Sequence, residues 1–145
     1  MTFNPNLTGI PPIARSAARS SQNNTGSTIP KGTPVKVTSV GVALVNVSLE
    51  ADVDAIAGVT RADISNLSQG DVAAAGLIEN ITTSFSTGDA VYISKTGILT
   101  NIKPSIGVNS FVAGDFVVRV GVIATNTGNI LQKDLLVSIQ LMGQL

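Results

Sequence analysis

The 145-residue chain contains no cysteine, no histidine and no tryptophan, and each absence excludes a kind of chemistry. Without cysteine no disulfide can stabilise the fold, and the redox compartment is left open. Without histidine and cysteine, a Ser-His-Asp triad, a Cys-His pair and the usual zinc ligand sets are excluded. One tyrosine and four phenylalanines leave few rings to stack against carbohydrate or single-stranded nucleic acid.

Charge is also scarce. Charged residues make up 12% of the chain, against roughly a quarter in ordinary soluble domains. The formal net charge is zero, so no global field attracts nucleic acid or anionic lipid. No apolar run approaches the ~20 residues that a membrane span needs. Because 43% of the residues are hydrophobic, we predict a subunit whose surface is largely covered by partners in an assembly.

The few charges are unevenly distributed along the chain. Four basic residues and no acidic ones precede Glu50, whereas nine acidic and five basic residues occupy the rest. The two parts therefore carry net charges of +4 and −4. We expect the basic N-terminal part to approach an acidic neighbour, such as the acidic body of another copy.

Residues 1–30 are predicted to form an extended N-terminal arm ahead of a β-barrel domain at 31–145. Asn, Ser, Thr, Gly and Pro dominate the segment, so little apolar surface is available to offset the entropy of folding. A disordered tail and an arm that orders on a partner are equally compatible with this composition. Residues 13–19 could form one or two helical turns. The predicted contacts with a partner protein or a neighbouring copy are Phe3, Ile10, Ile13, Arg15 and Arg19.

Four times a Gly followed by Thr or Asp opens a run rich in Val, Ile or Ala. These runs are residues 31–37, 69–74, 87–93 and 113–120. Gly adopts the positive φ that a turn requires, Asp or Thr bonds nearby backbone, and β-branched residues favour strands. The recurrence indicates an all-β fold, a small β-barrel or sandwich with short hairpins.

The expected strands are spread along the whole body of the chain. The clearest prediction is a hairpin in which 91–93 and 98–100 flank the turn 94–97, with Gly97 at a left-handed position. Residues 60–64 resemble a single capped helical turn, and 106–108 a short edge. The remaining strands are expected at 33–37, 42–49 with a bulge, 72–81 interrupted by Gly76, 116–124 and 135–142.

No carboxylate constellation indicates catalysis. Asp71, Asp89 and Asp115 recur in equivalent turns, so we interpret them as turn formers rather than as the acid and base of a hydrolase or lyase. Ser94 and Lys95 are adjacent, and neighbours on a strand face opposite sides, which disfavours a Ser/Lys dyad. We expect no enzymatic activity, no cofactor and no small-molecule substrate.

Glu50, Asp52 and Asp54 are spaced by two residues and would share one face of a strand. Three carboxylates can hold a hard cation such as Ca²⁺, but the Gly and distal Glu of a calcium loop are missing. A solvated acidic edge that discourages strand aggregation is the favoured interpretation. Whether a cation binds there stays open.

The order of these pieces resembles the small β-barrel capsid decoration (cement) proteins of tailed bacteriophages. The resemblance covers about residues 30–125, and its motifs are Gly-and-Val patterns. The matching segments are GTPV at 32–35, AGVTRADISN at 57–66, GDVAAAG at 70–76, GDAVY at 88–92, GILT at 97–100 and VGVI at 120–123. The arm at 1–30 is not part of the common barrel pattern.

The resemblance implies a structural role on the outer surface of a virion made in the host cytoplasm. Cement proteins bind the major capsid protein, bridge its neighbouring subunits and are often trimers. A homotrimer is therefore expected. The alternative is the trimeric base or shaft domain of a phage head or tail fibre, although a fibre should show a longer repeat array or an aromatic-rich tip.

Overall fold

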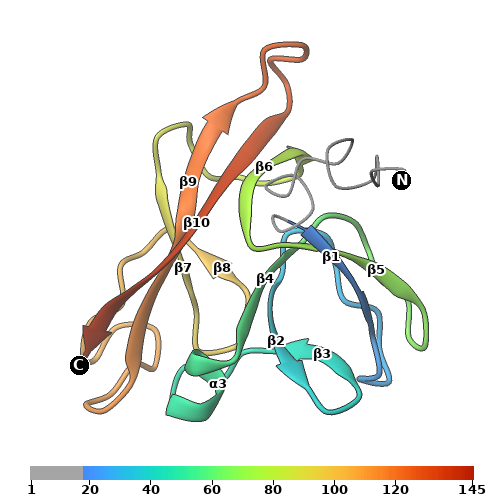
Figure 1. Cartoon of the computed structure of the whole chain (residues 1–145). Coiled ribbons are helices and arrows are strands. Elements are labelled where there is room, and N and C mark those ends of the chain that lie inside the picture. The colour runs from blue at the N-terminus through green and yellow to red at the C-terminus, as the bar shows by residue number, and fades with distance from the viewer. Residues whose placement is uncertain (1–17) are drawn as a thin grey trace, which may run out of the picture.

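A computed structural model describes residues 18–145, which form an all-β fold of two five-stranded antiparallel sheets (Figure 1). The sheets pack as in a sandwich, and the strand ladders close neither of them into a barrel. The first sheet has the order β1-β5-β4-β2-β3 and the second β6-β10-β9-β7-β8. The elements are β1 Ala18–Gln22, β2 Pro34–Thr38, β3 Gly41–Leu44, α3 Glu50–Asp54, β4 Ile56–Thr60, β5 Gln69–Ala73, β6 Ala75–Ile81, β7 Ala90–Ile93, β8 Leu99–Thr100, β9 Phe116–Thr125 and β10 Lys133–Gln144.

The main hydrophobic core lies between the two sheets. Val59 of β4 and Ala73 of β5 belong to it, together with apolar side chains from β6, β7, β9 and β10. A second, smaller core of Ile29, Val35, Val42, Ile64 and Val72 belongs to the first sheet and its loops. Adjacent residues on a strand point to opposite faces, so Val72 and Ala73 reach different cores. Both faces of the first sheet are therefore covered at its centre.

Residues 18–22 form the first strand of the first sheet, and Asn23 and Ile29 make single bridges to Val42 and Ile64, so the arm predicted to extend to residue 30 is too long. The strand β1 pairs with β5 over five positions. Beyond it, buried Asn23 donates through Nδ2 to the carbonyls of Ser27 at 2.6 Å and Ile64 at 2.7 Å. Ile29 is buried in the smaller core. The sequence did not predict this strand because its residues are polar. Backbone pairing with β5 and the hydrogen bonds of the buried Asn23 side chain hold it in place, rather than burial of apolar side chains.

The predicted hairpin at 91–100 and the strands around it are confirmed. Tyr92 pairs with Thr100 and Ile93 with Leu99, and Gly97 has a φ of 85°. The predicted apolar run at 116–124 forms β9, which lies between β10 and β7. The strands expected at 33–37 and 135–142 are β2 and β10.

Two expected strands end earlier than their sequences indicate. The run 42–49 leaves the sheet after Leu44, and Val45 and Val47 are both buried in the main core instead of forming a bulged strand. The run 72–81 is divided at Ala74, where the chain passes from the first sheet to the second. Gly76, the expected interruption, lies inside β6.

Local patterns were wrong in three further places. Thr60 ends β4 and Ile64 forms a bridge with Ile29, so residues 60–64 make no helical turn. Residues 106–108 form a turn rather than an edge strand. Conversely, Glu50–Asp54 forms the short helix α3, which places buried Val53 in the main core. At residues 60–64 and at α3 a tertiary contact overrides a weak local preference, whereas residues 106–108 are held by hydrogen bonds within their own loop.

The longest elements, β9 and β10, form one hairpin that extends beyond the rest of the molecule (Figure 1). Gly121 of β9 has no room for a side chain, because a Cβ there would stand 2.0 Å from the carbonyl oxygen of Leu136 in β10. The hairpin supplies Val118, Val120 and Ile123 to the main core and still leaves a turn projecting into solvent.

Truncation tests the place of β1 in the sheet. Deleting residues 1–28 removes β1 and Asn23, which exposes the edge of β5 and takes away one of the two donors to the carbonyl of Ile64, the other being the N–H of Ile29. We expect the melting temperature to fall by about 10 °C or more in calorimetry. Deleting residues 1–17 is the matched control and should change it by only a few degrees, roughly. Equal melting temperatures for the two truncations would contradict the assignment of β1 to the sheet.

Candidate functional site

Two of the predicted Gly-Asp turns share one geometry. In the turns 86–89 and 112–115, Gly88 and Gly114 have φ values of 92° and 96° at the third position. The carboxylate of the fourth residue accepts the backbone N–H of the first, at 2.9 Å for Asp89 from Ser86 and 2.9 Å for Asp115 from Val112. These aspartates therefore act as turn formers, as the sequence predicted.

In the turn that contains Thr33, the side chain of the fourth residue also bonds to the backbone of the first residue, but it donates the hydrogen bond instead of accepting it. Pro30 begins this turn and has no N–H to donate, so an Asp at position 33 would find no partner. Thr33 instead donates its hydroxyl to the carbonyl of Pro30 at 2.6 Å. Asp71 departs from the pattern, because it lies exposed within β5 and Gly70 lacks a positive φ. The interpretation of Asp71 as a turn former is therefore wrong.

Asp115 does more than close its own turn. Its carboxylate is buried and accepts hydrogen bonds from Lys95 Nζ at 2.7 Å and Ser48 Oγ at 2.8 Å, in addition to that from Val112. Lys95 Nζ also contacts Ser48 Oγ at 2.7 Å and lies 5.9 Å from the centre of the Phe111 ring. The cluster joins the segment after β3, the β7–β8 turn and the start of β9.

The cluster contains a serine and a lysine within hydrogen-bond distance, which the sequence did not predict because Ser48 and Lys95 are 47 residues apart. Burial raises the pKa of Asp115, but the hydrogen bonds from Lys95, Val112 and Ser48 outweigh it and hold the pKa below the ordinary 3.8. Lys95 Nζ donates to Asp115 Oδ2 and to Ser48 Oγ, and Ser48 donates its own hydroxyl to Asp115 Oδ1, so the geometry supports a structural ion pair.

The acidic trio Glu50, Asp52 and Asp54 lies on α3 and not on a strand, so the expected shared face does not exist. Asp52 is buried and binds Lys36 Nζ at 2.6 Å and the N–H of Asn46 at 2.9 Å, whereas Glu50 and Asp54 are exposed. Within residues 18–145 no group of three or more potential ligands is arranged to hold a metal ion. The interpretation of an acidic strand edge is corrected accordingly.

The basic N-terminal part meets acidic and carbonyl partners inside its own chain. Lys36 pairs with Asp52, and Lys31 Nζ donates to the carbonyl oxygens of Glu79 at 2.6 Å and Asn80 at 3.2 Å. Arg19, a predicted contact residue, is exposed on β1 and therefore not in the helical turn expected at 13–19. The other predicted contacts, Phe3, Ile10, Ile13 and Arg15, lie outside the described residues.

The solvent-facing side of the second sheet carries a row of apolar side chains. Leu136 of β10 pairs with Leu77 of β6 and with Val122 of β9, so the three side chains lie side by side on one face. Leu77 and Leu136 are exposed, and a shallow hollow beside Val122 and Leu136 is bordered by Arg119 and Gln140. We call this surface the outer face.

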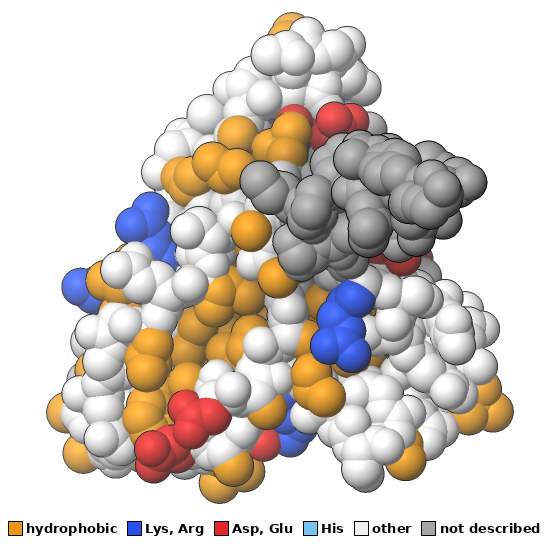
Figure 2. Space-filling view, viewed as in Figure 1, with side chains coloured by type: hydrophobic (Ala, Val, Ile, Leu, Met, Phe, Trp, Pro, Cys, Tyr) orange, Lys and Arg blue, Asp and Glu red, His pale blue; other side chains and the backbone are white. Residues whose placement is uncertain are grey.

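The turn that ends the β9–β10 hairpin exposes two more large aliphatic side chains. Ile130 and Leu131 are 84% and 88% exposed, the highest values among the large hydrophobic residues described. The space-filling view shows apolar side chains at the end of this hairpin and over the middle of the same face of the molecule (Figure 2). We call Ile130 and Leu131 the apolar tip. The sequence signal that could have predicted the apolar tip is a pair of aliphatic residues next to a turn rich in Asn, Thr and Gly.

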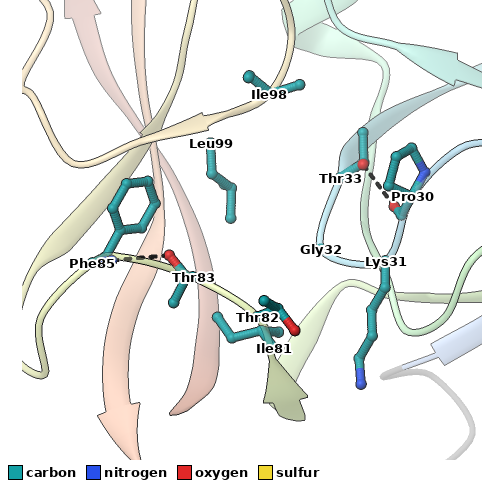
Figure 3. A pocket seen from close by; sticks show the side chains of 10 residues that line it. All are labelled: Pro30, Lys31, Gly32, Thr33, Ile81, Thr82, Thr83, Phe85, Ile98 and Leu99. Atoms are coloured by element: carbon teal, nitrogen blue, oxygen red, sulfur yellow. Dashed lines mark hydrogen bonds between the residues drawn. The ribbon is translucent and has the colours of Figure 1, made fainter. Parts of the chain in front are cut away.

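A cleft of about 240 Å³ lies between the two sheets (Figure 3). Ile81, Phe85, Ile98 and Leu99 line it from the second sheet and its loops, and the turn that precedes β2 faces them. We call it the intersheet cleft. Its remaining lining residues are Pro30, Lys31, Gly32, Thr33, Thr82 and Thr83. No local pattern predicted this cleft, since its walls are far apart along the chain.

A comparison with protein-family models, curated proteins and solved structures found no significant match to this chain. Among residues 18–145, no helix has the length and apolar character required to cross a membrane.

Replacing Lys95 tests the ion pair. Lys95→Met leaves the carboxylate of Asp115 buried without its charged partner, and we expect the free energy of unfolding to fall by about 3 kcal/mol. Lys103→Met, at an exposed lysine, should change it by less than about 0.5 kcal/mol. Urea unfolding of the three proteins measures both values. A loss at Lys95 no larger than that at Lys103 would show that the cluster does not stabilise the fold.

The two buried aspartates, Asp52 and Asp115, make the stability of the fold sensitive to acid. Burial raises the pKa of Asp52, but hydrogen bonds from Lys36 and Asn46 lower it overall, so the pKa values of Asp52 and Asp115 both lie below 3.8 in the folded state. Their stabilisation is therefore fully present above about pH 4 and lost as the pH falls through the folded-state pKa values. We expect the unfolding free energy to decline as the pH falls below about 4. Asp115→Asn should make this decline less steep. An unchanged dependence of the unfolding free energy on pH would contradict the assignment of Asp115 as one of the groups responsible.

Proposed function

We propose that the chain is a structural virion protein, a capsid cement subunit that binds the outer shell and bridges neighbouring copies of the major capsid protein. The proposal draws on the Gly-and-Val motifs that resemble cement proteins and on the exposed apolar surface. In this role the chain works as a homotrimer and performs no catalysis.

The observation that carries the proposal is the apolar outer face. Leu77, Leu136 and Val122 are adjacent across three strands, and a contiguous apolar surface of this kind marks a protein contact more often than a free surface does. Large aliphatic residues are also exposed elsewhere, at Val40, Leu67, Ile102, Ile106 and Val112. Few charges separate them, because only 12% of the chain is charged.

A cement subunit needs only modest affinity at each contact. When several copies or several surfaces engage together, the later contacts form at high effective concentration, and the combined affinity greatly exceeds that of one contact. The outer face supplies one such contact. A rigid sandwich, with two covered cores and the buried Asp115 cluster, then holds the contacting surfaces at fixed positions.

Particle binding tests the proposal. We expect the chain to co-purify with virus particles at a fixed copy number relative to the major shell protein, measured by quantitative mass spectrometry. Leu136→Asp places a charge in the outer face and should reduce occupancy at least about tenfold, equivalent to about 1.4 kcal/mol. Val40→Asp, at an exposed position in the β2–β3 turn, is the control and should bind as the parent does.

Two results would contradict the proposal. One is the absence of the chain from purified particles, and the other is equal occupancy by the Leu136 and Val40 variants. Melting temperatures of both variants, measured separately, show whether each remains folded.

A further inference from the structure

The apolar tip is held by a network of hydrogen bonds. Asn126 Oδ1 accepts the N–H groups of Gly128 at 2.9 Å and Asn129 at 2.8 Å. Asn126 Nδ2 donates to Asn80 Oδ1 at 2.7 Å and to Asp134 Oδ1 at 3.0 Å. The side chain of one buried asparagine therefore ties the hairpin end to β10 and to the end of β6, which fixes the direction in which the hairpin projects.

Ile130 and Leu131 are the central residues of a four-residue turn. Gln132 N–H donates to the carbonyl of Asn129 at 3.0 Å, and Leu131 N–H donates to Asn129 Oδ1 at 3.0 Å. Such positions are usually taken by Gly, Pro, Asn, Asp or Ser. Here two large aliphatic side chains are presented to water on a backbone that is already ordered, so burying them against a partner requires little further ordering.

The intersheet cleft complements the apolar tip, because it is a hollow lined in part by apolar side chains. Its volume of about 240 Å³ is several times the ~30 Å³ share of one liquid water molecule. Four apolar side chains line one side, and Ile98 is itself 53% exposed. The one charged lining residue, Lys31, has its ammonium group bonded to two backbone carbonyls. An aliphatic side chain could enter without leaving a charge unpaired.

We propose that the apolar tip of one copy occupies the intersheet cleft of the next copy. The occupant is a second copy because this chain carries both halves of the contact. No charged residue lies between Thr125 and Gln132, so like charges on the tip do not oppose the approach. A tip-to-cleft contact joins different surfaces of the two partners, and contacts of this type close into a ring when the rotation between copies closes and form open filaments when it does not. A closed ring of three copies fits the proposed homotrimer. The inference rests on the proposed function only in that a cement subunit acts as a homotrimer.

Mixing two variants tests this contact in solution, without capsids. The tip variant Ile130→Asp/Leu131→Asp keeps an intact cleft, and the cleft variant Thr82→Trp keeps an intact tip. Light scattering at micromolar concentration should show a trimer for the parent and a monomer for each variant alone. An equimolar mixture should form a 1:1 dimer that grows no further, because the intact tip of the cleft variant occupies the intact cleft of the tip variant, and only a mutated tip and a blocked cleft are left. Val40→Trp, in the β2–β3 turn, should remain trimeric.

Other outcomes overturn the inference. A monomeric parent protein would do so, as would a cleft variant that stays trimeric or a mixture that forms no dimer. If the tip variant stays trimeric but loses occupancy on particles, the tip contacts the capsid, and the proposed function stands while this inference fails. Ile130→Ser/Leu131→Ser, a second tip variant without added charge, separates loss of the apolar contact from charge repulsion.

Discussion

The buried carboxylate of Asp115 is the interaction on which the arrangement of the loops depends. It accepts the N–H of its own turn, the hydroxyl of Ser48 and the ammonium of Lys95, so three distant segments meet at one ionised group. An ionised group in such a place is tolerated only because every donor is supplied by the protein. Beside it, the N–H of Phe116 donates to the carbonyl of Val47, which continues the connection into β9. The long β9–β10 hairpin begins from this anchored point.

The joining of distant segments at Asp115 affects how the surface of the protein can be used. The two cores take up the apolar residues of the strand interiors, yet the outer face, the apolar tip and the intersheet cleft leave further apolar side chains in contact with solvent. The scaffold presents these surfaces at fixed positions, and little ordering is needed when a partner covers them. A structural subunit uses a surface of this kind, which is why we favour assembly over catalysis as the role of the chain.

The strongest sequence predictions concerned features that local chemistry controls. The hairpin at 91–100 follows from β-branched strands around a Gly turn, and the turns at Asp89 and Asp115 follow from a carboxylate that bonds nearby backbone. Predictions that depended on a distant partner were wrong. Glu50, Asp52 and Asp54 alternate as a strand would, but α3 forms because Val53 packs into the core and Asp52 pairs with Lys36.

By itself, the sequence determined that this is an all-β chain with short turns and a shortage of charge, because strand and turn preferences reside in single residues and their neighbours. Only the tertiary structure decided that residues 18–22 form a strand of the first sheet, that Ser48 and Lys95 meet at Asp115, and that a cleft opens between the sheets. Those outcomes require groups separated by tens of residues to pair or pack together. Such contacts are determined by the whole fold, and no local pattern encodes them.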